Sequence, residues 1–377
     1  MKFPVYNGLN ERKVINMLKI VHIADLHLDS PFALSSMTER GEKRQELKDA
    51  LSDVCDYCLE NEIDVLLVAG DLFDGDFVRR ETVEFASGCF AKIPKTRVFI
   101  APGNHDAYGS ASPYKYCSFP DNVHIFSEET LESVVIPELS CAVYGYGFNS
   151  ERMIENPLSG IHPFDTERIN ILVAHGDLDN GASPYYNIKS ADLASSDIDY
   201  VALGHIHKPS GFMHFGNTVC AYSGCLVGRD FGECGTRGMI AGEIIKGNIA
   251  LKYIPVTEGG YEEITVDVTE KNIQAIADVV KAKSSGFSEK KHIRIILSGE
   301  REEEMDTRML KDLLPSFRTL EIKDLTRQSL ALDELLKEYS LKGAFARMIK
   351  PYLESDSTDI SEKASIALKY GLDALKK

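Results

Sequence analysis

The sequence predicts an α/β protein whose sheets are covered by helices, and two observations lead to this prediction. Through the first two-thirds of the chain, short runs of apolar residues alternate with longer stretches of helical periodicity. Strands that are apolar throughout and alternate with helices are typical of sheets that are buried on both faces. With 377 residues, the chain is also long enough for a large core and for two domains.

Each element of this part is predicted from a local pattern. Consecutive apolar residues indicate strands, and apolar residues three or four positions apart indicate helices. The predicted elements are, in chain order, a strand over 20–24, a helix over about 42–61, a strand over 63–69, a helix over about 78–91, and strands over 97–100, 169–174 and 200–203.

The pattern changes near Pro255. The stretch TEGGYEEITVDVTE predicts a linker followed by a strand, and two further strands are predicted at HIRIILSG and TLEIKDL. The end of the chain has leucines and other apolar residues at helical spacing. We therefore expect a first domain over 17–256 and a smaller α/β domain with a helical tail over 257–377. Residues 1–16 are polar and unpatterned, and we expect either an extension from an upstream start or a disordered tail.

The composition excludes several classes of protein. No run approaches the roughly 18 apolar residues of a membrane span, and the first residues lack the apolar core of a signal peptide. We therefore expect a cytoplasmic protein. Cys55 and Cys58 form a C-x-x-C within a helical pattern, with no second pair nearby, which favours buried thiols over a zinc or redox site. The net charge of −16 argues against broad affinity for nucleic acid, so a nuclease would need a local patch, bound metals or a partner.

Five of the predicted strands are followed directly by Asp, Asn or His residues. The first ends in Asp25 and His27, which are two residues apart and so leave an extended chain on the same face. A single D-x-H favours a capping aspartate and a chance surface histidine over a site. Five such ends, each beside glycine or proline, indicate a site built where strands end. The other four ends carry, in chain order, Asp71, Asn104 and His105, His175, and His205 and His207.

These residue types indicate a metal site. A mixture of Asp, Asn and His without Cys suits Mn²⁺, Fe²⁺ or Zn²⁺ better than a structural thiolate zinc. The candidates are too many for one ion, but they suit two ions about 3.5–4 Å apart that share a carboxylate. Such a pair binds a phosphoryl group, lowers the pKa of a bound water and neutralises charge during in-line displacement.

The motifs D-x-H, G-D, G-N-H-D, H-G and G-H-x-H, in this order, resemble those of the calcineurin-like metallophosphoesterase superfamily. The longer stretches HIADLHLDSPF, GDLFD, PGNHD, ALGHIHKP and YSGCLVGRDFGECGTRG resemble the SbcD-type DNA repair exonucleases, and within these the YhaO-like branch. The resemblance implies a layered α/β/β/α metallophosphoesterase sandwich over 17–256. It also implies that 257–377 form a capping domain that binds substrate or a partner.

The resemblance also assigns roles to the strand-end residues. It places the first metal on Asp25, His27, Asp71 and His207, and the second on Asp71, Asn104, His175 and His205, with Asp71 as the bridge. His105 would face the substrate, stabilise the transition state and help to protonate the leaving oxygen. Asp74 would orient His105; many relatives of the archaeal and eukaryotic kind have a second histidine there, so Asp74 places this chain on the bacterial side. Cys225 stands where relatives commonly have serine.

The sequence also suggests roles for residues outside the proposed ligand set. Asp106 is either a carboxylate that orients the site or a turn aspartate, and Arg229 is a candidate phosphate contact. His22 has the opposite strand parity from Asp25 and His27, so we expect a packed core histidine. Tyr146 and Phe148 either stack on a base or belong to the core, and core aromatics are the commoner case.

The resemblance implies a two-metal-dependent phosphodiesterase that hydrolyses DNA, with in-line attack by a metal-bound hydroxide and assistance from His105. It also implies DNA and an SbcC-like coiled-coil ATPase as partners, and a homodimer. Two other hypotheses stay open: a phosphatase or phosphodiesterase of small nucleotides or phosphoproteins, and a non-catalytic scaffold subunit of an SbcC-like ATPase complex. The sequence does not decide between exonuclease and endonuclease, nor does it decide polarity, strand preference, DNA against RNA, or the native metal.

Overall fold

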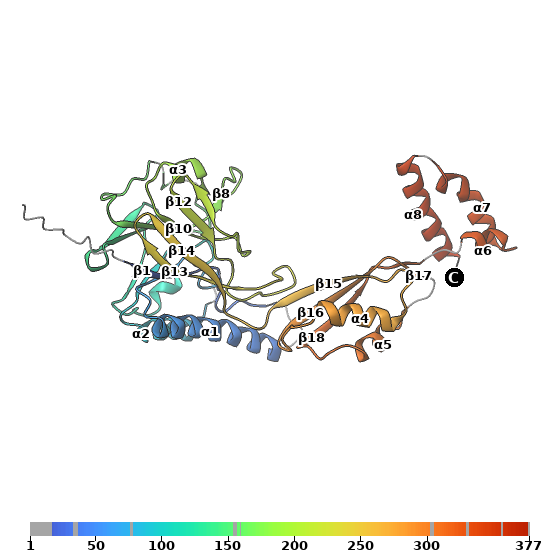
Figure 1. Cartoon of the computed structure of the whole chain (residues 1–377), viewed down its shortest axis with the longest axis horizontal. Helices are drawn as coiled ribbons and strands as arrows, with labels where there is room; N and C mark the ends of the chain where they lie inside the picture. The colour runs from blue at the N-terminus through green and yellow to red at the C-terminus, as the bar shows by residue number, and fades with distance from the viewer. Residues whose placement is uncertain are drawn as a thin grey trace, which may run out of the picture. The chain divides into compact units, whose positions relative to one another are not determined.

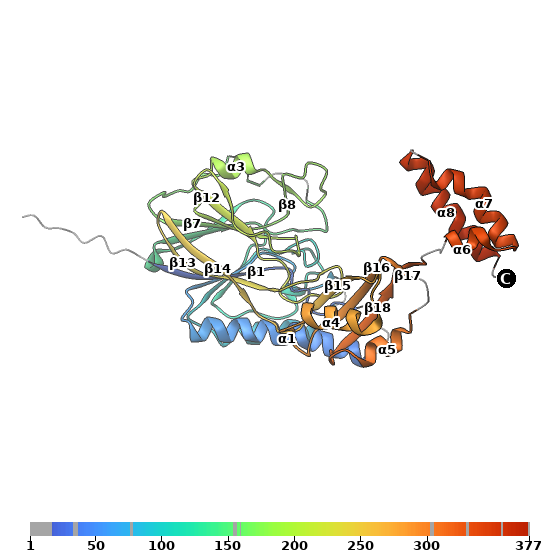
Figure 2. The ribbon, with the colours of Figure 1, turned by 45° about the vertical axis from the view of Figure 1, so that its right-hand side comes forward.

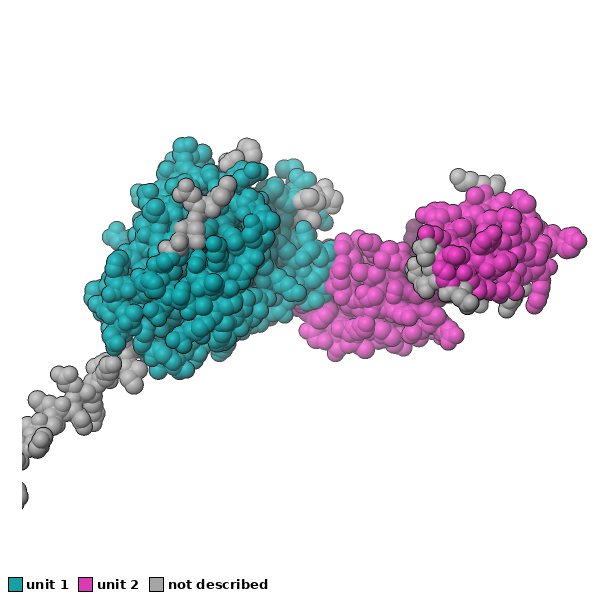
Figure 3. All heavy atoms as spheres, turned by 90° about the horizontal axis from the view of Figure 1, so that it is seen from above, with its two compact units in different colours: residues 1–262 teal, residues 263–377 magenta. Residues whose placement is uncertain are grey.

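The computed structural model describes residues 17–32, 37–75, 78–153, 157–158, 160–301, 305–328, 332–355 and 357–375. The expected extension over 1–16 lies outside these residues. The chain divides into two compact units, Met1–Glu262 and Glu263–Lys377, which Figure 3 shows in different colours. The sequence predicts the boundary after residue 256, and the division of the structure falls after Glu262.

The first unit, whose ribbon is drawn in Figure 1, contains two six-stranded mixed sheets. In the first sheet β1 to β4 run parallel and a hairpin of β13 and β14 pairs antiparallel with β1. Its strands, in spatial order, are β14 (Asn248–Pro255), β13 (Gly238–Ile245), β1 (Leu18–Ile23), β2 (Val65–Val68), β3 (Arg97–Ile100) and β4 (Val123–Ile125).

The second sheet is parallel at its centre and has an antiparallel strand at each edge. Its strands, in spatial order, are β11 (Met213–Phe215), β12 (Thr218–Tyr222), β10 (Tyr200–Gly204), β7 (Ile169–His175), β6 (Cys141–Gly145) and β5 (Glu132–Ile136). A short parallel pair, β8 (Asp177–Leu178) and β9 (Asn187–Ile188), lies beyond β7 in the sequence.

Three apolar clusters hold the layers of this unit together. Side chains such as Ile20 and Phe99 of the first sheet pack against Ile171 and Tyr200 of the second and fill the space between the sheets. The outer face of the first sheet is covered by α1 (Met37–Glu60) and α2 (Arg80–Ala91), and the outer face of the second by loops and α3 (Ser190–Ala194). Figure 2 shows this order from α1 through the two sheets to α3. The predicted α/β/β/α sandwich is confirmed.

Burial on both faces explains why the central strands are apolar throughout. Every residue of β2, β7 and β10 is buried. The helix α1 buries a stripe of residues three or four apart, which includes Cys55 and Cys58, so the C-x-x-C is a pair of free buried thiols, as expected. The helix begins at Met37, five residues before the predicted start at 42. The predicted helix over 78–91 begins only at Arg80, because the preceding residue Arg79 is still extended.

The second unit has its own core. Its three-stranded sheet, in which β16 and β18 run parallel, is packed against two helices by a cluster of buried aliphatic side chains. A separate small cluster around Ala346 and Leu368 joins three further helices. In chain order the elements are β15 (Tyr261–Asp267), α4 (Ile273–Lys283), β16 (His292–Ser298), β17 (Glu300–Arg301), α5 (Thr307–Asp312), β18 (Thr319–Asp324), β19 (Arg327–Gln328), α6 (Leu332–Lys337), α7 (Leu341–Leu353) and α8 (Thr358–Ala374).

Among the residues with a described structure, no helix is both long enough and apolar enough to cross a membrane.

Candidate metal centre

The five strand ends that carry Asp, Asn or His side chains lie close together in the first unit. The strands β1, β2 and β3 are parallel within one sheet, and β7 and β10 are parallel within the other, so each sheet brings its carboxyl ends to one edge. Contacts between the strand ends then join the two edges. The backbone N–H of His205, after β10, donates to Asp25 Oδ1, after β1, over 2.9 Å.

The first group of candidate ligands consists of Asp25, His27 and His207, whose ligand atoms all lie within 4.8 Å of one another. The Nε2 atoms of His27 and His207 are 3.1 Å apart. The same His27 atom lies 3.7 Å from Asp71 Oδ2. The ligands that the resemblance assigns to the first metal are thus brought together.

The second group surrounds the other side of Asp71. His175 Nε2 lies 3.5 Å from Asp71 Oδ2 and 3.0 Å from Asn104 Oδ1. His205 Nδ1 lies 3.2 Å from the same Asn104 oxygen. Asp71 contacts ligands of both groups, which is the position that a bridging carboxylate requires.

The hydrogen bonds of the histidines show that these residues fit metal ions. His175 Nδ1–H donates to the carbonyl of Ala69 over 3.0 Å, which leaves the lone pair of Nε2 facing Asn104 Oδ1 and Asp71 Oδ2. These atoms are all acceptors, and acceptors that converge without a hydrogen between them repel one another. A divalent cation among them removes that repulsion, and nitrogen and oxygen donors without sulfur suit Mn²⁺, Fe²⁺ or Zn²⁺.

Burial favours the neutral form of three of these imidazoles, which is the form that binds metal. It lowers the pKa of His175 to about 4, and it also lowers the pKa values of His27 and His205. Burial and the neighbouring charge of Asp71 raise the pKa of Asp25 well above its usual range. Two carboxylates buried this close repel each other, and bound cations are the physical remedy for that repulsion.

The backbone at these ligands is held in an uncommon conformation. Asp25, His27, Asp71 and His205 all have positive φ angles, of 52°, 50°, 50° and 103°. Such conformations cost energy for residues other than glycine, and they cluster at functional sites. The first position of the G-N-H-D motif must be glycine, because a Cβ on Gly103 would lie 2.2 Å from Asp71 Oδ1.

His105 lies at the edge of the centre, with its side chain 45% exposed. Its Nδ1 is 3.0 Å from Asp74 Oδ1, and this hydrogen bond raises the pKa of His105. Its backbone N–H donates to Asp71 Oδ1 over 2.9 Å. Asp74 Oδ1 also lies 3.4 Å from Nδ1 of His27, so the carboxylate of Asp74 contacts both a candidate ligand, His27, and the exposed His105.

Asp106 proves to be a residue that positions the site. Its buried carboxylate accepts the backbone N–H groups of Leu72 and Gly103 over 2.8 and 2.7 Å, and the hydroxyl of Tyr114 over 2.6 Å. It therefore ties the loop that carries Asp71 to the loop that carries Asn104 and His105. Burial and the charge of Asp71 raise the pKa of Asp106 to about 7.

Arg229 and Glu233 form a pair behind His207, and sequence reasoning did not single out Glu233. Glu233 Oε1 lies 2.6 Å from His207 Nδ1 and 3.0 Å from Arg229 Nη2. Nδ1–H of His207 donates a hydrogen bond to this carboxylate, which leaves the lone pair on Nε2, the atom that lies 3.1 Å from His27 Nε2. Cys225 Sγ lies 3.7 Å from Glu233 Oε2, so the cysteine at the usual serine position supports the same carboxylate. The only signal for Glu233 was an acid inside the GRDFGECGTRG stretch.

The remaining candidates divide between core and site. Tyr146 and Phe148 are fully buried, so they are core residues and do not stack on bases. His22 is buried as expected, with Nδ1 2.9 Å from the hydroxyl of Tyr200. Asp177, which follows His175 in the motif H-G-D, reaches the centre: its Oδ2 lies 3.5 Å from His205 Nε2.

Residues 18–209 match the calcineurin-like phosphoesterase family. The match covers half of the chain and includes all of the candidate ligands described above, while β11 to β14 follow it in the sequence. The chain belongs to this family, and it is a hydrolase that acts on phosphoester bonds.

Three relatives are similar over most of their length. The chain is 28% identical over 296 residues to an uncharacterized metallophosphoesterase, YhaO, of Bacillus subtilis, covering 75% of this chain and 72% of that protein. It is 24% identical over 307 residues to a subunit of the nuclease SbcCD of Staphylococcus epidermidis, covering 68% and 77%. It is 25% identical over 321 residues to the DNA double-strand break repair protein Mre11 of Saccharolobus solfataricus, covering 79% and 78%.

Proposed function

We propose that this protein is a two-metal phosphodiesterase that hydrolyses DNA. Asp25, His27 and His207 hold one ion, Asn104, His175 and His205 hold the other, and Asp71 bridges the two. The observation that carries the proposal is the convergence of imidazole nitrogens and carboxylates on both sides of Asp71. Mn²⁺ is the ion we expect, because it accepts mixed oxygen and imidazole ligands.

The side chains around this centre have separate tasks. Bound divalent ions supply positive charge for the phosphoryl oxygens and lower the pKa of an attacking water. His105, exposed beside the ligands, donates a proton to the leaving oxygen, and Asp74 raises the pKa of its imidazole and orients the ring. Asp106 and Glu233 hold the loops and ligand rings in place.

DNA as the substrate is supported by two relatives. Their names describe a subunit of a nuclease and a DNA double-strand break repair protein, and the matches cover more than two-thirds of each. The first of these names also points to a complex with a further subunit, and we propose an SbcC-like coiled-coil ATPase as the partner, acting with a homodimer in the cytoplasm. The ATPase would supply DNA affinity that a chain of net charge −16 lacks.

The test is hydrolysis in the presence of Mn²⁺ of a single-stranded oligonucleotide, a duplex with free ends and bis-p-nitrophenyl phosphate. The wild-type protein should cleave DNA. Asp71→Ala should abolish cleavage, because it removes the bridging carboxylate. His105→Ala should lower kcat by about 10²–10⁴, which is typical of the loss of a general acid.

Two exposed residues provide matched controls, His162→Ala and Asp121→Ala, which should retain wild-type rates. Hydrolysis of the small diester with DNA left intact, even after addition of the ATPase partner, would contradict the DNA substrate. An unchanged rate in Asp71→Ala would contradict the metal centre itself.

A further inference from the structure

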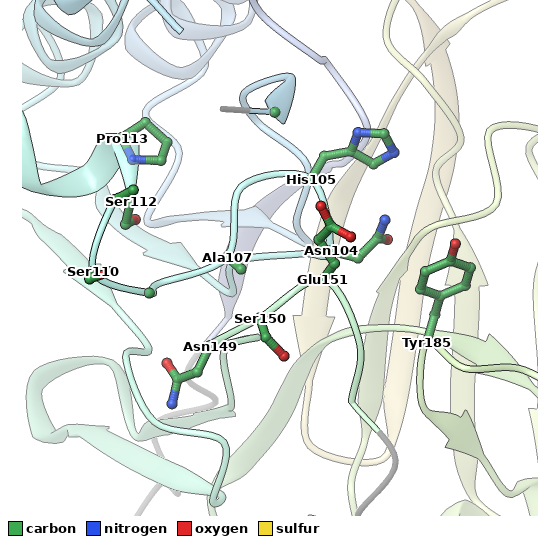
Figure 4. A pocket seen from close by; sticks show the side chains of 13 residues that line it. Asn104, His105, Ala107, Ser110, Ser112, Pro113, Asn149, Ser150, Glu151 and Tyr185 are labelled. Carbon is green, nitrogen blue, oxygen red and sulfur yellow. The ribbon is translucent and has the colours of Figure 1, made fainter. Parts of the chain in front are cut away.

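A cavity of about 460 Å³ borders the metal centre on the side of His105. Figure 4 shows Asn104 and His105 together with Asn149, Ser150, Glu151 and Tyr185 in its wall. We call this cavity the terminal pocket. All of its lining residues belong to the first unit. Its volume lies at the small end of the range of about 300–1,000 Å³ for pockets that bind small molecules, which suits one nucleoside.

The wall of the terminal pocket is polar and carries negative charge. It contains hydroxyl and amide groups, the carboxylate of Glu151 and, at its border with the metal centre, the imidazole of His105; no lysine or arginine lines it among the described residues. Glu151 is exposed and has no ion-pair partner in the described part of the chain. Such a wall offers hydrogen bonds to a sugar or base and repels a second phosphate.

A second cavity, of about 630 Å³, borders the centre on the side of His205 and His207. Its wall includes the exposed Lys208 as well as Asp230 and Glu233, whereas Arg237 in the same wall is buried and donates to backbone carbonyls. The two cavities share no lining residue. A nucleic acid strand has a phosphate on every internal nucleoside. The exposed Lys208 gives the second cavity a cation for the phosphates of the continuing strand.

We propose that the terminal pocket binds the end nucleoside of a strand, next to the scissile phosphate, and that Glu151 selects ends with a free hydroxyl over ends that carry a further phosphate. The inference rests on the proposed function, because the nucleoside enters beside His105 only if the scissile phosphate lies on the metal centre. It deepens that function: an internal nucleoside carries a second phosphodiester anion, so the same carboxylate favours cleavage at ends over cleavage within a strand.

The experiment compares three thymidine dinucleotides with the full-length protein and Mn²⁺: one with hydroxyl groups at both ends, one with a 5′-phosphate and one with a 3′-phosphate. The readout is the ratio of kcat/KM values between substrates, which does not depend on the fraction of active protein. The wild-type protein should cleave the hydroxyl-ended dinucleotide at least about tenfold better than one of the phosphorylated forms, a modest discrimination for a charge contact.

Substitutions then identify the group responsible. Glu151→Gln should bring the ratio close to one, because it removes the charge and keeps the shape, and Glu151→Lys should reverse the preference. Glu129→Gln removes an exposed carboxylate elsewhere and should keep the wild-type ratio. Equal kcat/KM for all three dinucleotides in the wild-type protein, or a ratio that Glu151→Gln leaves unchanged, would overturn the inference.

Failure of the inference is distinguishable from failure of the proposed function. If the wild-type protein with Mn²⁺ hydrolyses neither bis-p-nitrophenyl phosphate nor any dinucleotide, the proposed function fails and the inference falls with it. If it hydrolyses all three dinucleotides without preference, the proposed function stands and the role of Glu151 alone is excluded.

Discussion

Glu233 is the residue on which the orientation of His207 depends. Its carboxylate lies 2.6 Å from His207 Nδ1, and hydrogen bonds with His207 and Arg229 outweigh the effect of burial and hold its pKa well below the usual range. In Glu233→Gln the amide oxygen is a weaker acceptor, so the ring is less firmly held. We expect Mn²⁺ affinity to fall by about 10–100-fold, as for other residues that support a metal ligand. Calorimetric titration of the metal-free protein with Mn²⁺ measures this.

Glu243→Gln is the matched control for this measurement, because Glu243 is exposed on β13 and should leave the affinity unchanged. Equal affinities of Glu233→Gln and the wild-type protein would mean that packing alone orients His207.

Asp106 affects stability as well as the site. Both of its oxygens accept buried hydrogen bonds, from Gly103 N–H on one side and from Leu72 N–H and the Tyr114 hydroxyl on the other. In Asp106→Asn one oxygen becomes an NH₂ group that faces these donors. An unsatisfied buried group costs about 1–3 kcal/mol, so we expect the free energy of unfolding to fall by about that amount. Urea denaturation measures it, with the exposed Asp121→Asn as a neutral control.

At the scale of elements, β1 carries a titratable group into the space between the sheets. His22 on β1 contacts the hydroxyl of Tyr200 on β10, and burial lowers the pKa of His22 to about 3 from 6.5. Between these pH values the unfolded chain binds a proton at this position and the folded chain does not. The free energy of unfolding therefore falls as the pH falls from about 6.5 toward 3, by at most about 1.4 kcal/mol per pH unit from this group.

The variant His22→Gln should remove this contribution, because glutamine keeps a polar contact and does not titrate. Urea denaturation from pH 7 to pH 4, with a chelator present throughout so that metal loss does not contribute, should give a shallower pH dependence than in the wild-type protein. His162→Gln, at an exposed histidine, should follow the wild-type curve. Parallel curves for His22→Gln and the wild-type protein would contradict the buried neutral imidazole.

At the scale of the whole molecule, the first unit contains everything that the metal centre needs. Its three apolar clusters and all candidate ligands lie within Met1–Glu262, and the second unit has apolar clusters of its own. We expect a chain that ends after Glu262 to fold, to bind metal and to hydrolyse bis-p-nitrophenyl phosphate at a rate close to that of the full chain. An unfolded fragment, by circular dichroism, would show that the units depend on each other for stability.

Much of the fold and the site could be predicted from the sequence because both depend on local patterns. Apolar runs that end in Asp, Asn or His indicated strands and their functional ends, and the order of motifs indicated the family. Short edge strands such as β4 and β11 were not predicted, since three residues at a sheet edge carry too weak a pattern. Glu233 was missed because its role depends on a contact 26 residues away along the chain.

The sequence by itself determined the class of fold and which strands end in Asp, Asn or His, because strand periodicity and side-chain chemistry are local properties. Only the tertiary structure decided that Asp106 ties two loops together, that Glu233 supports His207 and that Tyr146 and Phe148 belong to the core. These roles depend on which side chains meet when two sheets close on each other, and distance along a chain does not specify distance in space. The terminal pocket and Glu151 in its wall likewise exist only once loops from different strands are brought together.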